Sequence, residues 1–338
     1  MLGFFPLEAV FFVFLGVLAV TITLQRDLFA AGMLTGIFSL VSAALFTLMD
    51  AVDVAFTEAA VGAGISTVLF LATLALTKDK EKPGFHRPIG ATLVVLLTGG
   101  ALIYGTLDMP IWGVADAPIH THVARHFIDT SYRDIGIPNM VTAILASYRG
   151  YDTFGELAVV FTAGTGVTLL LQQKGIFSSE ASAVPAKSRA PYVREMPVLR
   201  SISKVMLPYI LLFALYVQAH GDFGPGGGFQ AGVIFASGFI LYGLVWGPGA
   251  LQRFVGGRPV QVLMASGVLL YGGVGLFCLL AGFPFLDYSA LSPAHPEHGQ
   301  HYGIFLVEVG VGITVSAVMM IIYFLFSVRP RVGSGVPR

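Results

Sequence analysis

The chain has 338 residues, of which 55% are hydrophobic and 11% are charged, and its mean hydropathy is +0.80. Soluble domains carry about 25% charged residues, so this composition indicates a membrane protein. The 19 basic residues balance the 19 acidic ones, which leaves no net charge to attract nucleic acid. The single cysteine, Cys278, excludes an internal disulfide and a cysteine-rich metal site.

Nine apolar runs approach the roughly 20 residues that a helix needs to cross a bilayer. They cover Phe4–Leu24, Leu28–Met49, Val54–Leu76, Ile89–Leu107, Phe154–Leu171, Ser201–Ala219, Phe229–Trp246, Val260–Gly282 and Tyr302–Val328. The first run has no basic leader or small-residue cleavage site, so we expect a retained span, not a signal peptide. The prediction is an all-α integral membrane protein with about nine transmembrane helices.

Two polar segments interrupt these runs. Between the fourth and fifth runs, Asp108–Tyr151 contains an amphipathic stretch, Ala124–Arg133, and Pro138–Tyr148, which is too short to span. We expect an outer helical segment that is interfacial or re-entrant. The stretch Lys174–Glu195 is rich in Ser, Ala, Pro and Lys and predicts a linker between a block of five spans and a block of four. No region outside the runs is long enough for a soluble catalytic domain.

Basic residues predict the orientation. With the N-terminus outside, all but three of the 19 basic residues fall on the inner side, and only Arg125, Arg133 and Arg149 remain outside. This bias follows the positive-inside rule and places the C-terminus in the cytoplasm.

The segment His220–Phe229 joins the sixth and seventh runs with a turn that contains Gly226, Gly227 and Gly228. Glycine and proline prevent a continuous helix here. A phosphate loop would follow a strand and carry Lys and Ser or Thr, so nucleotide binding is not expected. His220 is a candidate for the ion path because it ends an apolar helix, although capping that helix would also explain it.

Four carboxylates near or within the spans are candidates for an ion path: Asp53, Glu58, Glu156 and Glu308. A carboxylate in hydrocarbon costs a few kcal/mol or more, so it normally faces a partner, water or an ion. Glu58 and Glu156 are predicted to belong to one path, although Glu58 could also be shallow and hydrated. Glu308 could line a polar path or pair with a neighbouring subunit. Asp152 is explained by the helix dipole, and Arg149 could pair with it or with Glu156.

Small residues at helical spacing predict close packing of the seventh run at Gly228, Gly232 and Ala236. Gly62 and Gly64 permit close packing or a local break in the third span. Two histidine groups, His120/His122/His126 and His295/His298/His301, lack the spacing of a strong helical metal site, so no metal or cofactor is predicted.

The stretch His220-Gly-Asp-Phe-Gly-Pro-Gly-Gly-Gly-Phe-Gln-Ala-Gly232 and its flanking helices resemble the MnhB/MrpB subunit of multisubunit monovalent cation/proton antiporters. The resemblance covers about Arg194–Val328. The family often has His in place of Asp222, a Gly-Gly pair in place of Ala231-Gly232, and Asp in place of Glu308.

The N-terminal half resembles other parts of the same complexes. The stretch Asp53–Thr67 resembles the MbhD-like segment of the large MrpA protein, and Asp129–Glu156 resembles the adjoining MbhE-like segment. The resemblance implies MbhD-like helices and the following span at 1–107, an MbhE-like segment with one span at 108–173, a linker at 174–199, and an MnhB-like four-helix domain at 200–338.

The resemblance implies a non-enzymatic subunit in the cell membrane that contributes carboxylates to a Na+/H+ path. Its expected partners are the antiporter-like large subunits and the small membrane subunits of a Mrp-type complex. Two alternatives remain open: a component of a redox-driven ion pump, such as a membrane-bound hydrogenase, and a purely structural adaptor. A stand-alone transporter is disfavoured because the two blocks are not inverted repeats.

Overall fold

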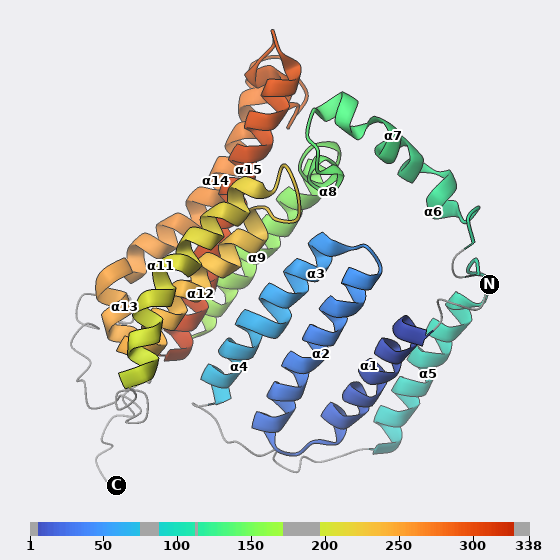
Figure 1. The fold of residues 1–338 in the computed structure, drawn as a ribbon, viewed down its shortest axis with the longest axis vertical. Coiled ribbons are helices and arrows are strands. Elements are labelled where there is room, and N and C mark those ends of the chain that lie inside the picture. The colour runs from blue at the N-terminus through green and yellow to red at the C-terminus, as the bar shows by residue number, and fades with distance from the viewer. Residues whose placement is uncertain (1–5, 75–87, 112–113, 172–196, 328–338) are drawn as a thin grey trace.

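The polypeptide folds into long helices joined by short turns (Figure 1), seen in a computed structural model that describes residues 6–74, 88–111, 114–171 and 197–327. Within these ranges, nine helical segments are long and apolar enough to cross a membrane. The prediction of an all-α membrane protein with nine spans is therefore confirmed. The predicted linker Lys174–Glu195 lies outside the described residues, as do most of the basic residues placed on the inner side.

The first four spans occupy the N-terminal part of the chain. Their elements are α1 (Pro6–Leu24), α2 (Leu28–Leu48), α3 (Val52–Glu58), the π-helical η1 (Ala59–Ser66), α4 (Thr67–Leu74) and α5 (Pro88–Thr106). Asp27 caps α2 by accepting a hydrogen bond from the backbone N–H of Ala30 at 2.9 Å. The third span is a single rod made of α3, η1 and α4, in which the hydrogen-bond pattern changes in the middle. Such π-helical stretches occur frequently at functional sites.

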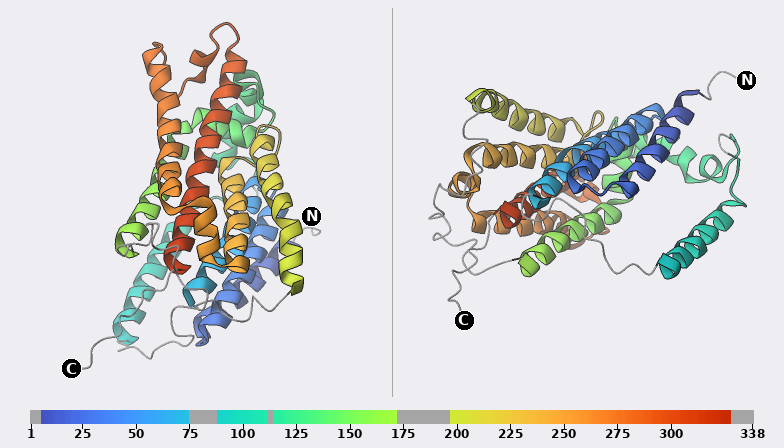
Figure 2. Two further views of the ribbon diagram at one scale, coloured as in Figure 1. Left: turned by 90° about the vertical axis from the view of Figure 1, so that its left-hand side faces the viewer. Right: turned by 90° about the horizontal axis from the view of Figure 1, so that it is seen from below.

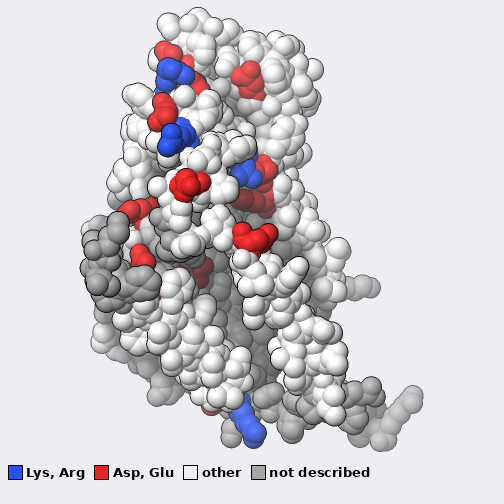
Figure 3. Space-filling model, turned by 90° about the vertical axis from the view of Figure 1, so that its right-hand side faces the viewer, with Lys and Arg blue, Asp and Glu red and all other residues white. Residues whose placement is uncertain are grey.

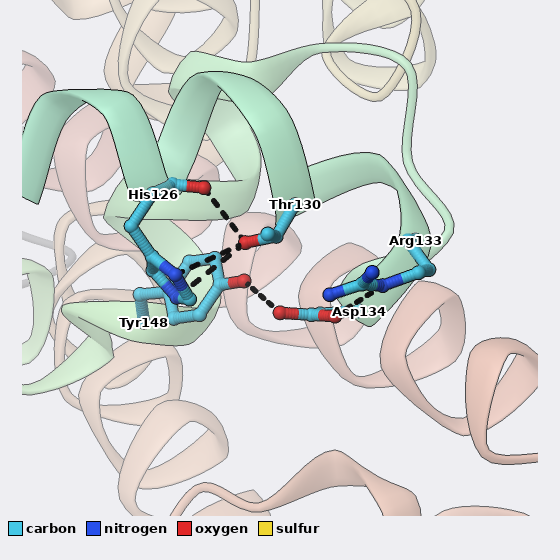
Figure 4. Close-up of polar contacts among 5 residues, drawn as sticks. All are labelled: His126, Thr130, Arg133, Asp134 and Tyr148. Atoms are coloured by element: carbon cyan, nitrogen blue, oxygen red, sulfur yellow. Dashed lines mark hydrogen bonds and ion pairs between the residues drawn. The ribbon is translucent and has the colours of Figure 1, made fainter.

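A chain of short helices follows α5 along the upper edge of the molecule (Figure 1). These are α6 (Pro118–Thr121), α7 (Val123–Ile135), α8 (Met140–Thr142) and the π-helical η2 (Ala143–Tyr148). Figure 4 shows how α7 is attached to η2: the Tyr148 hydroxyl donates to the Asp134 carboxylate at 2.9 Å. This bond holds the pKa of Asp134 below its usual value. The segment forms the short, non-spanning helices expected from the sequence.

The remaining helices form a bundle around the last span. They are α9 (Gly150–Leu171), α11 (Pro197–His220), α12 (Gly228–Trp246), α13 (Pro248–Val255), α14 (Gly257–Leu280), the 3₁₀ turn η5 (Tyr288–Leu291) and α15 (Pro296–Ser327). Both α12 and α14 pack along α15, and α9 also contacts it (Figures 1 and 2). The 32 residues of α15 extend about 48 Å, which exceeds the roughly 30 Å of a hydrocarbon core.

Glycines allow α12 and α15 to approach closely. A Cβ at Gly228 would overlap the carbonyl oxygen of Glu308, and one at Gly232 would lie 2.8 Å from the carbonyl oxygen of Gly312. Ala236, two turns along α12 from Gly228, is completely buried. The stripe of small residues identified in the sequence therefore faces α15, and much of the buried core lies along this last helix.

Two of the spans are largely uncovered. Of the described parts of the chain, α1 packs mainly against α2, whereas α5 makes no extensive contact with any other helix. In the view from below, α5 stands apart from the bundle (Figure 2). Apolar side chains are exposed around α5, as at Leu93, Val95 and Leu97, which are 56%, 67% and 66% exposed. Such a helix requires lipid or another subunit around it.

Most charged side chains in this view lie in the upper half of the face, above a largely uncharged surface with a basic side chain at its lower edge (Figure 3). This separation is expected for a protein whose middle lies in hydrocarbon.

Several helix boundaries differ from the sequence prediction. The last span begins at Pro296 instead of Tyr302, and the sixth begins at Pro197 instead of Ser201. Both helices extend back beyond their apolar stretches to a proline, whose missing N–H costs nothing in the first helical turn. The short helix α13 between two spans was not predicted, because its eight residues are too few for a clear hydropathy signal.

Candidate functional site

The glycine loop, residues 221–227, connects α11 to α12 and organises the site. The carbonyl of His220 accepts hydrogen bonds from the N–H groups of Phe223 and Gly224, which ends α11 in a tight turn. At Gly227 the backbone has φ +120°, a conformation that residues with a side chain rarely adopt. The loop then enters α12 directly at Gly228, against α15.

Asn139 fastens the outer segment to this loop. Its buried amide donates to the carbonyls of Gly221 and Gly224, both at 2.9 Å. Its side-chain oxygen caps α8 by accepting from the N–H groups of Val141 and Thr142. Thr142 adds a hydroxyl bond of 2.7 Å to the carbonyl of Gly221. One asparagine therefore satisfies the backbone of two segments that lie far apart in the sequence.

The N-terminal block reaches the same loop through α3. The backbone N–H of Gly226 donates to the Asp53 carboxylate at 3.3 Å, and the Gln230 amide donates to the Thr57 hydroxyl at 2.9 Å. Asp53 and Thr57 are one helical turn apart and share a face of α3. This face is therefore turned toward α12 and the glycine loop.

These segments line a partly open cavity of about 240 Å³. Its lining comes from several helices and from the glycine loop. The polar side chains that line it are those of Asp53, Thr57, Thr142, Thr153, Glu156, Gln230, Tyr271 and Glu308. Three of the four candidate carboxylates thus face one space, and the described lining contains no Lys, Arg or His.

Glu308 occupies an unusual position in this cavity. Its Oε2 atom is buried and lacks a hydrogen-bond partner among the described residues, a situation shared only with Nε2 of Gln218. Gly221 and Gly227 lie against its carboxylate, because a Cβ at either position would come within 3.0 Å of a carboxylate oxygen. A buried acceptor without a partner usually indicates an ion or water that binds there, or a role in chemistry.

The two acidic residues at the start of α9 differ. Asp152 pairs with Arg149, whose Nε donates to Oδ2 at 2.6 Å, and both side chains are largely exposed. Glu156 forms no ion pair in the described structure and lines the cavity, although it is also exposed at the surface of α9. Arg149 therefore pairs with Asp152, which agrees with the helix-end role given to that residue.

Glu58 lies elsewhere. It is the last residue of α3, directly before the π-helical η1, and it does not line the cavity. Its neighbours are Gly62 and Ser39 of α2, because a Cβ at Gly62 would lie 2.5 Å from both Glu58 Oε1 and Ser39 Oγ. Gly64, also in η1, is exposed. The structure therefore brings Glu156 together with Asp53 and Glu308, but not with Glu58.

The histidines are not part of the described lining of the cavity. The His220 ring stacks on Tyr216 with centroids 5.1 Å apart, and the residue ends α11. Among the described residues, no group of three or more His, Cys, Asp or Glu side chains is arranged to hold a metal.

Sequence reasoning missed the contact between Asp222 and His301. Asp222 is only 4% exposed, and its Oδ2 lies 2.7 Å from Nδ1 of His301 at the start of α15. Burial raises the pKa of Asp222, and His301 opposes this rise. The pair fixes the glycine loop to α15, whereas Asn139 fixes the same loop to α8. The only feature of the sequence that could have pointed to this contact is the presence of an acidic residue, Asp222, in a glycine-rich turn.

Three family models match successive parts of the chain. The MbhD and MbhE models, which describe two components of MBH, match residues 13–79 and 93–188, and the domain related to the MnhB subunit of Na+/H+ antiporter matches 198–321. The "Putative antiporter subunit mnhB2" of Staphylococcus aureus is 30% identical over 132 residues, which are 38% of this chain and 92% of that protein. The chain belongs to the MnhB family.

A longer relative joins the same parts. The probable K(+)/H(+) antiporter A/B protein of Rhizobium meliloti is 27% identical over 291 residues, covering 80% of this MnhB-family chain. The chain spans only 29% of the length of that relative.

Two solved structures share the fold. A chain in the Mrp complex from Dietzia sp. DQ12-45-1b superposes with a TM-score of 0.73 and 24% identity, over 99% of this chain and 36% of that one. A chain of the membrane-bound sulfane sulfur reductase, an archaeal respiratory membrane complex, gives a TM-score of 0.55 and 27% identity, over 71% of this chain and 97% of that one. The MnhB-family chain is thus a multi-pass membrane protein with a fold found in both kinds of assembly.

The cavity lies where the three matched ranges meet. Asp53 belongs to the range matched by MbhD, Glu156 to the range matched by MbhE, and Glu308 and the glycine loop to the MnhB range.

Proposed function

We propose that this chain is a membrane subunit of a multisubunit monovalent cation/proton antiporter and that it contributes carboxylates to the ion path. The observation that carries the proposal is the cavity lined by Asp53, Glu156 and Glu308 without a basic side chain in its described lining. A carboxylate at membrane depth costs about 2.5–3.5 kcal/mol on insertion scales, so three around one space require a compensating role. Passage of cations or protons supplies one.

The chain works, on this proposal, together with antiporter-like large subunits and small membrane subunits. The uncovered apolar surface of α5 supports such partners, because a helix with this surface packs against lipid or protein. The division into an MbhD-like part at 1–107, an MbhE-like part at 108–173, a linker at 174–199 and an MnhB-like part at 200–338 belongs to the same proposal. The proposal also includes a location in the cell membrane, a cytoplasmic C-terminus and the absence of a resident cofactor or enzymatic activity.

The test is exchange by the assembled complex in everted membrane vesicles from cells without other Na+/H+ antiporters. Glu308→Gln keeps the shape of the side chain and removes its charge. We expect the rate of Na+- or K+-dependent proton release to fall at least about tenfold, equivalent to 1.4 kcal/mol in the barrier. Asp152→Asn is the matched control, because Asp152 pairs with Arg149 and does not line the cavity. Normal exchange by an assembled Glu308→Gln, Asp53→Asn double variant would favour the structural-adaptor alternative.

Glu58 and Glu156 are proposed as further members of the ion path, and His220 as a residue at its edge. Glu58→Gln and Glu156→Gln in the same vesicles test each separately. Glu58 lies outside the cavity. If the single change Glu58→Gln abolishes exchange, the path continues along α2 beside η1.

A redox-driven pump is the second candidate, favoured by the likeness to a chain of the archaeal respiratory complex. The two functions differ in their energy source. Purified complex in liposomes with no electron donor should exchange cations for protons if it is an antiporter. Exchange that appears only after a reductant and an acceptor are added would assign it to the redox-driven class.

A further inference from the structure

Two carboxylates from different helices approach the glycine loop at one end of the cavity. Asp53 of α3 accepts the N–H of Gly226, and Glu308 of α15 lies against Gly221 and Gly227. The first acid belongs to the N-terminal block and the second to the C-terminal block. The loop between them is fixed by hydrogen bonds from the α8 segment to its backbone carbonyls.

The charge at this end of the cavity is not balanced by a basic group in the described lining; the nearby Asp222 of the glycine loop is a further carboxyl, and it pairs with His301. Asp53 has a backbone donor, whereas Oε2 of Glu308 is buried and has no partner among the described residues. None of the described lining residues is basic. Burying an isolated carboxylate without compensation costs several kcal/mol, so Glu308 requires either a proton or a cation.

The polar groups that line the cavity suit a cation that prefers oxygen ligands. Gln230 donates its amide N–H to the Thr57 hydroxyl, which leaves its carbonyl oxygen available as an acceptor. The carboxylates of Asp53 and Glu308 add further oxygens, the ligand type that Na+, K+ and other hard cations share. The cavity of about 240 Å³ leaves room for several water molecules, so a bound cation can keep part of its hydration shell.

We propose that this end of the cavity binds one monovalent cation, Na+ or K+, between Asp53 and Glu308, in competition with a proton. The inference rests on the proposed transport function and assigns a site within it. A singly charged ion can replace one proton at Glu308 without a change in net charge, whereas a divalent ion would have to displace a second proton. When the cation enters, Glu308 loses its proton, and the net charge of the cavity is unchanged.

The test is equilibrium binding of radioactive Na+, and of Rb+ as a substitute for K+, to the purified complex that contains this chain. We expect binding to weaken as the pH falls. Glu308→Gln and Asp53→Asn should each weaken binding at one site per chain at least about tenfold, whereas Asp152→Asn should leave it unchanged. Glu308→Asp keeps the charge and should retain binding, which separates loss of the site from failure to assemble.

Three outcomes would overturn the inference. Binding that persists in both Glu308→Gln and Asp53→Asn would place the cation elsewhere. Binding of Ca2+ in preference to Na+ and Rb+ would make this a divalent site. Uptake of a proton at this site without binding of Na+ or Rb+ would show that the site binds protons only. Exchange measured on the same preparations separates the two proposals. Lost exchange with unchanged binding removes this site and keeps the role of the carboxylates in transport. Unchanged exchange and unchanged binding in both variants remove the site and also that role.

Discussion

At the scale of single residues, the site depends on polar side chains that sequence alone could not pair. Asn139 and Gly221 are 82 positions apart, yet the asparagine amide satisfies the carbonyl of that glycine. Asp53 and Glu58 are close in sequence but face different ways, because five residues rotate a helix by about 140° beyond one turn. Asp53 therefore faces the cavity and Glu58 faces α2. Carboxylates within apolar runs were predictable as candidates, but the partner of each was not.

The first prediction concerns the pH dependence of stability at Asp222. Burial raises the pKa of this carboxyl above its unfolded value of about 3.9, and His301 opposes the rise. An acid with a raised folded-state pKa contributes stability that is complete below the unfolded value and is lost as the pH rises through the folded value. His301→Ala should raise the pKa of Asp222 further. Because His301 acts on this pKa through its charge, the effect requires the protonated imidazole, and imidazoles are mostly neutral at roughly pH 8. The loss of melting temperature should therefore be larger at roughly pH 6 than at roughly pH 8.

We expect the cost of His301→Ala at the lower pH to lie near the lower end of about 1–3 kcal/mol, because the His301 side chain is 47% exposed. The measurement is thermal unfolding of the purified protein over a pH series. His298→Ala serves as control, since that ring lies beside His295 and not beside Asp222. A deficit that does not change with pH would contradict the role given to Asp222.

The second prediction separates the two tasks of Asn139. Asn139→Asp keeps the oxygen that caps α8 but cannot donate to the carbonyls of Gly221 and Gly224. With about 1 kcal/mol for each lost hydrogen bond, we expect roughly 2 kcal/mol or more of destabilisation. Thr142→Val removes one bond to the same loop and should cost about half as much. Unfolding midpoints measure both, and an Asn139→Asp protein as stable as the parent would mean that the loop is held in another way.

At the scale of helices, the fit of α12 against α15 depends on the absence of side chains. The sequence predicted a small-residue stripe because its spacing is local, but not which helix it would meet. The partner is the last span, whose backbone approaches Gly228 and Gly232. The third span is a related case: Gly62 and Gly64 permitted either close packing or a local break, and the structure has the π-helical η1 there.

The third prediction is therefore a loss of packing in Gly228→Ala. The added methyl group would overlap the backbone carbonyl of Glu308, which cannot move without displacing α15. We expect severe destabilisation, above roughly 3 kcal/mol, and a low yield of folded protein. Gly273→Ala in α14 is the matched control, since nothing lies within 4 Å of a Cβ there. That change should be neutral or stabilise by up to about 1 kcal/mol, and equal effects of the two changes on melting temperature would contradict the packing argument.

At the scale of the whole molecule, hydropathy was sufficient for the nine spans, because crossing a bilayer is a local requirement on about 20 residues. It was insufficient for the assembly of these spans. The cavity arises from contacts between α3, η2, α9, α12 and α15, which depend on the positions of all the helices at once. No local pattern records such an arrangement.

The fourth prediction concerns topology. With the N-terminus outside, the linker lies in the cytoplasm, and the segment that contains α6 and α7 lies outside. A cysteine at Ala183 should resist a membrane-impermeant thiol reagent in intact cells, whereas a cysteine at the exposed Asp116 should react. The native Cys278 has 0% exposure and should not contribute to the signal. Reaction at Ala183 with protection at Asp116 would invert the orientation.

The bonds from Asn139 to the glycine loop have a further consequence for relatives that divide these parts. The S. aureus protein corresponds to only 38% of this chain, and its alignment fills 92% of its own length. A protein of that length cannot contain counterparts of all three matched ranges of this chain. Here both sides of the contact belong to one polypeptide, so the contact forms within the chain and does not depend on the concentration of a partner. Fusion therefore fixes the stoichiometry of the parts at one to one and removes a diffusive encounter from assembly.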